Sequence, residues 1–144
     1  MRKEMGGVIK EFLFVYGTLR KETKTAMHDL FADCNYFSDG YMQGKLYEVN
    51  GYPGAIISED KADKIKGEIY TITVPGQILS HLDTYEECSE NFPQPHEYIR
   101  KKLTVSTIDG DTVQAWVYLY NRDVSGLTLI KSGDYLSYRK NLNE

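Results

Sequence analysis

The stretch YIRKKLTVSTIDGDTVQAWVYLYN, residues 98–121, carries the strongest fold signal in this chain. Two runs rich in β-branched and aromatic residues flank the central residues 109–111, DGD. An Asp-Gly pair between such runs is typical of a β-hairpin, because its tight turn needs residues that tolerate positive φ. We therefore expect strands over residues 98–108 and 112–121, paired antiparallel through this turn.

Outward from the hairpin, strand patterns recur and helical patterns are fewer. Short apolar or β-branched runs predict strands at 11–16, 41–49, 55–58 and 67–74, and NGYPG at 50–54 is a dense turn signal. Apolar residues at helical spacing predict helices at 22–33 and 77–85, and we expect the tail at 131–142 to be partly helical. The expected class is α+β: a small mixed β-barrel or strongly twisted sheet flanked by two or three helices.

The composition limits the class of protein. The chain has 144 residues, which favours a single domain over residues 1–144 with a core at about 11–121. Its net charge is 17 minus 21, or −4, and it has no long basic run, so we expect no nucleic-acid partner. No segment approaches the roughly 20 apolar residues of a membrane helix, so we expect no membrane association. Two cysteines and no evident signal peptide favour a cytoplasmic location.

One carboxylate stands out in the predicted second helix, which belongs to the stretch PGQILSHLDTYEEC at 75–88. Steps of three and four from Leu79 lead through Leu82 to Glu86, so Glu86 falls on the face that packs inward. Burial and the helix C-terminus would both raise the pKa of this carboxyl, which suits a general acid and base near neutral pH. The alternative is a structural carboxylate that bends to water or pairs with Arg100.

Other candidate chemistries have weaker signals. The three histidines lack metal-ligand spacing: His28, His81 and His96. Cys88 follows an acidic cluster, which disfavours a thiolate. The bend after residue 16 does not match the pattern of a nucleotide-binding P-loop. We therefore predict no metal site.

Four short motifs, taken together in their order along the chain, resemble the gamma-glutamylcyclotransferase-like superfamily. They are VYGTLR at 15–20, GEIY at 67–70, LDTYE at 82–86, and YIR at 98–100 followed by AWVYLYN at 115–121. The branches to which they are most similar are the avirulence-induced-gene-like proteins and gamma-glutamylamine cyclotransferase. The resemblance covers about residues 12–121 and implies a compact mixed barrel flanked by helices, with a pocket at one end.

The resemblance also implies an enzyme and its working residues. Backbone N–H groups of Tyr16, Gly17, Thr18 and Leu19 would bind the glutamyl part of a small gamma-glutamyl substrate. Glu86, the residue that helical spacing turns inward, would be the general acid and base. The α-amine of the substrate would attack its own side-chain amide and release 5-oxoproline and a free amine. The implied reaction needs no metal, no cofactor and no covalent intermediate.

Three tyrosines are further candidates for the pocket lining. Tyr52 stands in a Gly-Tyr-Pro segment that resembles the family's second pocket-edge loop, and Tyr98 and Tyr118 stand on expected strands. For Tyr98 and Tyr118 core packing is the alternative, as a plain tight turn is the alternative for Gly17.

The chain departs from the family pattern at Glu87, where Gly is common, and in a longer segment at 87–97. Both departures leave the identity of the substrate and the leaving amine open. Two other functions are compatible with the sequence. One is a non-catalytic module that binds a carboxylate metabolite, and the other is an interaction protein that keeps the fold alone. The sequence makes no prediction of the oligomeric state.

Overall fold

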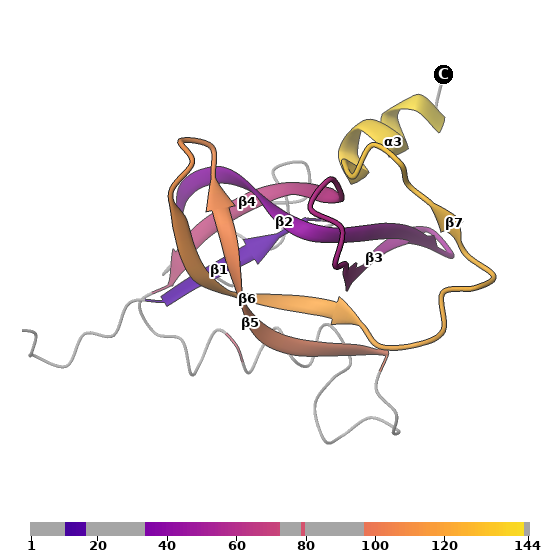
Figure 1. Ribbon diagram of the computed structural model, residues 1–144, viewed down its shortest axis with the longest axis horizontal. Helices are drawn as coiled ribbons and strands as arrows, with labels where there is room; N and C mark the ends of the chain where they lie inside the picture. Colours follow the sequence, from indigo (N-terminus) through magenta and orange to yellow (C-terminus); the bar gives the residue numbers. More distant parts are fainter. Residues whose placement is uncertain (1–10, 17–33, 73–78, 80–96, 143–144) are drawn as a thin grey trace, which may run out of the picture.

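The computed structural model describes residues 11–16, 34–72, 79 and 97–142. The strands in chain order are β1 (Glu11–Val15), β2 (Cys34–Val49), β3 (Tyr52–Ile57), β4 (Lys64–Ile72), β5 (Tyr98–Thr107), β6 (Thr112–Tyr120) and β7 (Thr128–Leu129), followed by helix α3 (Tyr135–Leu142). In Figure 1 the tip of the β5–β6 hairpin lies at the upper left and α3 at the upper right.

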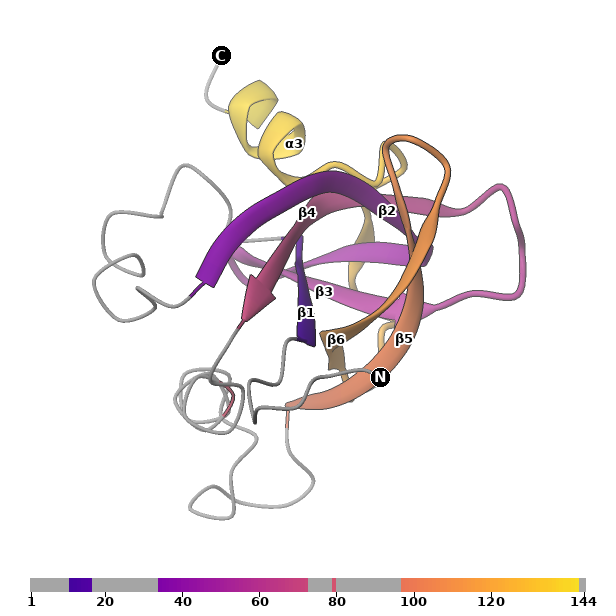
Figure 2. The ribbon, with the colours of Figure 1, turned by 90° about the vertical axis from the view of Figure 1, so that its left-hand side faces the viewer.

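Five of the strands close into a barrel in the order β2, β4, β1, β6, β5, with β5 pairing back to β2. The β1–β6 pair is parallel and the other pairs are antiparallel, so the barrel is mixed. β2 and β5 bend strongly to complete the circuit (Figures 1 and 2). The expected small mixed barrel is therefore confirmed.

β2 is long enough to serve two sheets. Its first part pairs with β4 inside the barrel, and its last residues pair with β3 and with the short β7. The β2–β3 connection is a two-residue turn in which Asn50 has a φ of 52° and Gly51 a φ of 101°. Positive φ at both positions gives the turn a backbone twist that matches the right-handed twist of the two strands it joins. The strand after it begins at Tyr52, earlier than the predicted residue 55.

Both faces of the central strands are buried. The barrel interior holds Phe14, Ile69 and Val117 among its least exposed side chains. The opposite face of β1, β4 and β6 carries a second apolar cluster, which includes Val15 and Ile72. Alternate residues of one strand therefore contribute to two different cores.

The expected hairpin is confirmed, and the expected helical tail is confirmed by α3. The predicted strand at 41–49 was too short, because β2 begins at Cys34. Ser38, Asp39 and Gly40 resemble turn residues, yet they pair with β4 through a register shift between Tyr36 and Ser38. β7 has only two residues and gave no sequence signal.

The flanking helices expected at 22–33 and 77–85 lie outside the described residues, apart from Leu79. Leu79 is helical and buried. In both views α3 lies outside the barrel (Figures 1 and 2). Across the described ranges, no helix has the length and apolar character needed to cross a membrane.

Candidate functional site

Four of the predicted pocket residues gather at one end of the barrel: Tyr16, Tyr52, Tyr98 and Tyr118. β1 and β6 are parallel, so their carboxyl ends meet at the same edge, and Tyr16 and Tyr118 lie there. Tyr98 begins β5, and Tyr52 begins β3. The other predicted site residues, Gly17, Thr18, Leu19 and Glu86, lie outside the described residues.

Tyr16 connects three strands just before the predicted bend. Its side chain is buried, and its hydroxyl donates a hydrogen bond to the backbone carbonyl of Tyr118 at 2.5 Å. The same hydroxyl accepts a hydrogen bond from the backbone N–H of Ala55 at 3.3 Å. The last residue before Gly17 is therefore held against β6 and β3.

Tyr98 anchors the same edge of β3. Its hydroxyl donates to the backbone carbonyl of Pro53 at 2.6 Å, two residues before the N–H that Tyr16 accepts. In a strand the carbonyl of one residue and the N–H two residues later point to the same side. The hydroxyls of Tyr16 and Tyr98 therefore form hydrogen bonds with backbone groups on the edge of β3. In a larger sheet a further strand would form these bonds.

Tyr52 links the β2–β3 hairpin to the start of β5. Its hydroxyl donates to Glu97 Oε2 at 2.5 Å, and its ring centroid lies 6.3 Å from that of Tyr98. Tyr98 packs edge-on against Tyr120, with centroids 5.6 Å apart. Burial, and next the charge of Glu97, raise the pKa of Tyr120. The structure thus fixes the end of the predicted 87–97 segment against a cluster of aromatic rings.

The Tyr118 side chain lies on the face of β6 that points away from the barrel interior, and it contacts Leu79. Its hydroxyl donates to the backbone carbonyl of Leu79 at 3.3 Å. The Leu79 side chain is buried in the cluster formed by Leu13, Val15 and Ile72. Leu79 therefore packs on the outer face of β1 and β6.

Arg100 belongs to the same outer face. It pairs across the hairpin with Tyr118, and its guanidinium carbon lies 4.7 Å from the centroid of the Trp116 ring. A guanidinium over an indole ring is a favourable cation–π contact. The outer face of β5 and β6 thus carries a positive charge over the Trp116 ring.

Sequence reasoning assigned no role to Glu68, although it lies beside this site. Glu68 on β4 is only 3% exposed and is the register partner of Val15 on β1. The Tyr70 hydroxyl donates to Glu68 Oε1 at 2.7 Å. A buried carboxylate is uncommon unless it is hydrogen-bonded. The sequence did contain a signal for its burial, because Glu68 shares one face of the predicted strand with Tyr70 and Ile72.

A known family of proteins shares most of this barrel. The family model described as gamma-glutamyl cyclotransferase, AIG2-like, matches residues 13–137. The chain belongs to this family. The resemblance inferred from the short motifs is therefore confirmed.

Relatives in this gamma-glutamyl cyclotransferase family match almost end to end. A relative from Methanocaldococcus jannaschii is 32% identical over 134 residues, which cover 90% of this chain and 98% of the relative. The gamma-glutamylcyclotransferase family protein YtfP of Escherichia coli is 32% identical over 130 residues, 89% of this chain and 98% of YtfP. Its solution NMR structure superimposes with a TM-score of 0.60.

The crystal structure of YkqA from Bacillus subtilis has a TM-score of 0.69 at 26% identity. The match covers 94% of this chain but 43% of YkqA, so this chain spans less than half of that protein's length. The barrel described above is therefore the shared part of the two structures.

Proposed function

We propose that this chain is a gamma-glutamylcyclotransferase-type enzyme that acts on a gamma-glutamyl amine or a gamma-glutamyl peptide. The α-amine nitrogen of the substrate attacks its own side-chain amide carbon and forms a five-membered ring. The bond between that carbon and the leaving nitrogen then breaks. The products are 5-oxoproline and a free amine.

In the proposed mechanism the chain supplies alignment and a proton carrier. Glu86 takes a proton from the attacking amine and returns one to the leaving nitrogen, a contribution typically about 10²–10⁴-fold. Backbone N–H groups from Tyr16 to Leu19 bind the glutamyl carboxylate or the developing oxyanion. Holding amine and carbonyl in contact contributes on the order of 7–11 kcal/mol.

The attachment of Leu79 is the observation that carries the proposal. Leu79 is buried against Leu13 and Val15 of β1, and its carbonyl accepts the Tyr118 hydroxyl. Helical spacing puts Glu86 on the same face as Leu79, seven residues later. This supports a carboxyl group directed toward the strand that leads into the predicted bend.

The tyrosine cluster supports the proposal in a second way. A site that aligns two reacting groups needs a rigid base. Tyr16 is hydrogen-bonded to β6 and β3, so the barrel holds the residue at which the predicted bend begins. Tyr52, Tyr98 and Tyr118 would then line the pocket with ring faces while their hydroxyls hold the frame.

Turnover tests the proposal directly. The purified chain is incubated with gamma-glutamyl-ε-lysine and, separately, with gamma-glutamyl-alanine, and 5-oxoproline is measured by mass spectrometry. We expect product from one of them, and a loss of about 10²–10⁴ in rate for Glu86→Gln.

Glu87→Gln is the matched control, because it removes the neighbouring carboxylate on the outer side of the predicted helix. It is expected to retain most of the activity. If Glu86→Gln releases product as fast as the unmodified chain, the acid–base role of Glu86 is wrong. If both substrates bind without turnover, the chain is a binding module for gamma-glutamyl compounds.

A further inference from the structure

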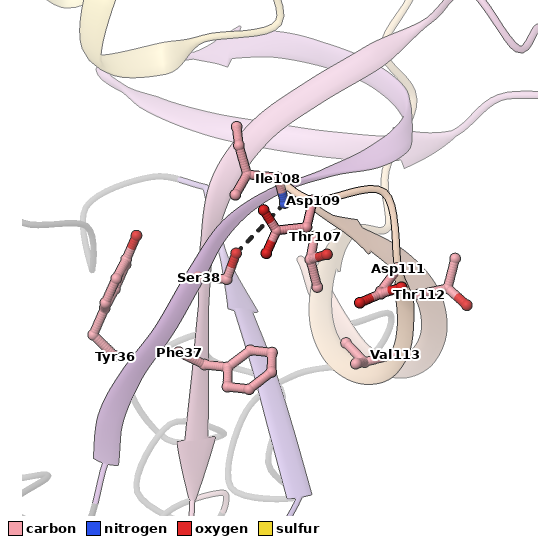
Figure 3. Close-up of a pocket in the computed structure, with 9 residues that line it drawn as sticks. All are labelled: Tyr36, Phe37, Ser38, Thr107, Ile108, Asp109, Asp111, Thr112 and Val113. Carbon is pink, nitrogen blue, oxygen red and sulfur yellow. Dashed lines mark hydrogen bonds between the residues drawn. The ribbon is translucent and has the colours of Figure 1, made fainter.

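A hollow lies at the end of the barrel opposite the tyrosine cluster. It has a volume of about 780 Å³ and lies between the start of β2 and the tip of the β5–β6 hairpin (Figure 3). Thr112 begins β6 here, whereas Tyr120 ends the same strand at the tyrosine cluster. Ligand sites are common in the mouths of β-barrels, and the volume is in the range of small-molecule sites.

The floor of the hollow is apolar and belongs to the barrel mouth. Figure 3 shows Phe37 of β2 pointing toward Thr107 and Val113 of the hairpin. The Phe37 ring lies 5.0 Å from that of Phe12, which packs on the barrel core. Phe37 and Ile108 are nevertheless 48% and 58% exposed. Apolar side chains that line a hollow and remain exposed are suited to the apolar body of a ligand.

The lining of the hollow includes one buried hydroxyl group, that of Thr107, which lacks a hydrogen bond to the described residues. Thr107 lines the hollow and is only 6% exposed, and its Oγ1 has no hydrogen-bond partner among the described residues. It lies on the same strand face as the core residue Val105, so its side chain points into the barrel end. Native structures rarely leave a buried hydroxyl unpaired. A ligand that donates or accepts one hydrogen bond here would satisfy it after rotation about χ1.

The charged side chains that line the hollow in the described part of the chain are all acidic. Asp109 and Asp111 are both exposed and both line it, and no lysine, arginine or histidine does so among the described residues. Neither carboxylate forms an ion pair within the described part of the chain. The hollow therefore favours a cation over an anion.

We propose that this barrel mouth binds a small organic cation, a primary amine on an apolar body. The apolar part would pack between Phe37 and Val113, and the ammonium would face Asp109 and Asp111. The Thr107 hydroxyl would accept a hydrogen bond from the ligand. The site is separate from the tyrosine cluster and does not depend on the proposed cyclotransferase reaction.

Phenethylamine is a suitable probe, because phenethyl alcohol has the same body without the charge and 3-phenylpropionate has the opposite charge. Each is titrated into the isotope-labelled full chain, and backbone amide shifts are followed by NMR. We expect saturable shifts at residues 37–38 and 107–113 with the amine, weaker shifts with the alcohol and none there with the carboxylate.

The variants separate charge from shape. The double variant Asp109→Asn/Asp111→Asn is expected to weaken amine binding about three- to tenfold, the range for two partly exposed ion pairs. Thr107→Val, which keeps the shape but removes the hydroxyl, should weaken it as well. The matched control is Asp123→Asn, an exposed aspartate just beyond the other end of β6, which should leave the affinity unchanged.

The following results would overturn the proposal. One is the absence of saturable shifts at the hairpin and at Phe37. Another is an equal response to the amine and the alcohol, or an undiminished affinity in the double variant. A further one is a response confined to the tyrosine end of the barrel, which would place amine binding at the proposed reaction site instead.

Discussion

Tyrosine hydroxyls organise this protein at the level of single residues. The hydroxyl of Tyr16 reaches a carbonyl 102 positions away in the sequence, and that of Tyr98 reaches one 45 positions away. Each phenol has an apolar ring for the core and a polar end for the backbone. The abundance of tyrosine, 12 residues against 5 Phe, thus has a structural use at the site.

Tyr16→Phe should destabilise the chain by about 1–3 kcal/mol, because it leaves the Tyr118 carbonyl and the Ala55 N–H buried without this partner. Urea denaturation measures the free energy of unfolding. Tyr41→Phe is the matched control, since the Tyr41 hydroxyl makes no hydrogen bond to the described residues. Equal stability of the two variants would show that the Tyr16 hydroxyl does not hold the frame.

Tyr135 should make stability depend on pH above about 10. Burial, and next the charge of Glu48, raise the pKa of its phenol above the ordinary value, although Arg139 opposes the shift. The unfolded chain therefore releases this proton at a lower pH than the folded chain does. The contribution is complete below pH 10 and falls as the pH rises toward the folded-state pKa.

The variant Tyr135→Phe should lose about 0.5–1.5 kcal/mol at neutral pH, because the hydrogen bond to the Gly51 carbonyl is gone. Its stability should then decline less steeply above pH 10 than that of the unmodified chain. Urea denaturation at a series of pH values from 7 to 11.5 measures both effects. Identical slopes above pH 10 would contradict the assignment.

At the level of elements, α3 is joined to the barrel by a close backbone approach. The carbonyl of Gly133 accepts a hydrogen bond from the Lys66 N–H at 2.7 Å, and Tyr135 and Tyr138 then pack against the core. Gly133 has a φ of 69°, and a Cβ there would lie 1.9 Å from the Lys64 carbonyl oxygen. This junction leaves no room for any side chain.

Gly133→Ala should lower the free energy of unfolding by at least about 2 kcal/mol, through both the positive φ and the collision. Gly110→Ala separates the two causes, because Gly110 has a φ of 94° but open space around it. Gly110→Ala should lower the free energy of unfolding by less, about 1 kcal/mol. Thermal unfolding of the two variants provides the measurement, and equal losses would argue against the collision.

At the level of the whole molecule, the barrel closes through a narrow seam. Only Gly40 and Tyr41 of β2 pair with β5. A Cβ on Gly40 would lie 2.4 Å from the Ser106 carbonyl oxygen and 2.7 Å from the Ile69 Cδ1. The absence of a side chain at Gly40 therefore permits the approach of the two strands.

Gly40→Ala should cost about 1–3 kcal/mol and should increase hydrogen exchange at the β2–β5 pairs. Gly126→Ala is the control, since no atom lies within 4 Å of a Cβ there, and its effect should stay within about 0.5 kcal/mol. Chemical denaturation and amide exchange report the two effects. Unchanged exchange at the seam would mean that the barrel tolerates a wider closure.

Local signals were sufficient for several features of this chain. The Asp-Gly turn predicted the β5–β6 hairpin, the tail at 131–142 was expected to be partly helical, as α3 is, and short motifs in a fixed order indicated the gamma-glutamyl cyclotransferase family. Each of these depends on a few neighbouring residues, whose backbone preferences do not need the rest of the molecule. The roles of Glu86 and of the bend at residues 17–19 come from the same kind of signal and stay predictions.

Other features depend on contacts between distant segments. The early start of β2 at Cys34 requires pairing with β4, which overrides the turn character of Ser38 and Gly40. The grouping of four tyrosines at one barrel end, the burial of Glu68 and the attachment of Leu79 arise only when the strands meet. The local conformational preferences of a residue are the same in any fold. The residues that it contacts and the exposure of its side chain are decided by the closed barrel.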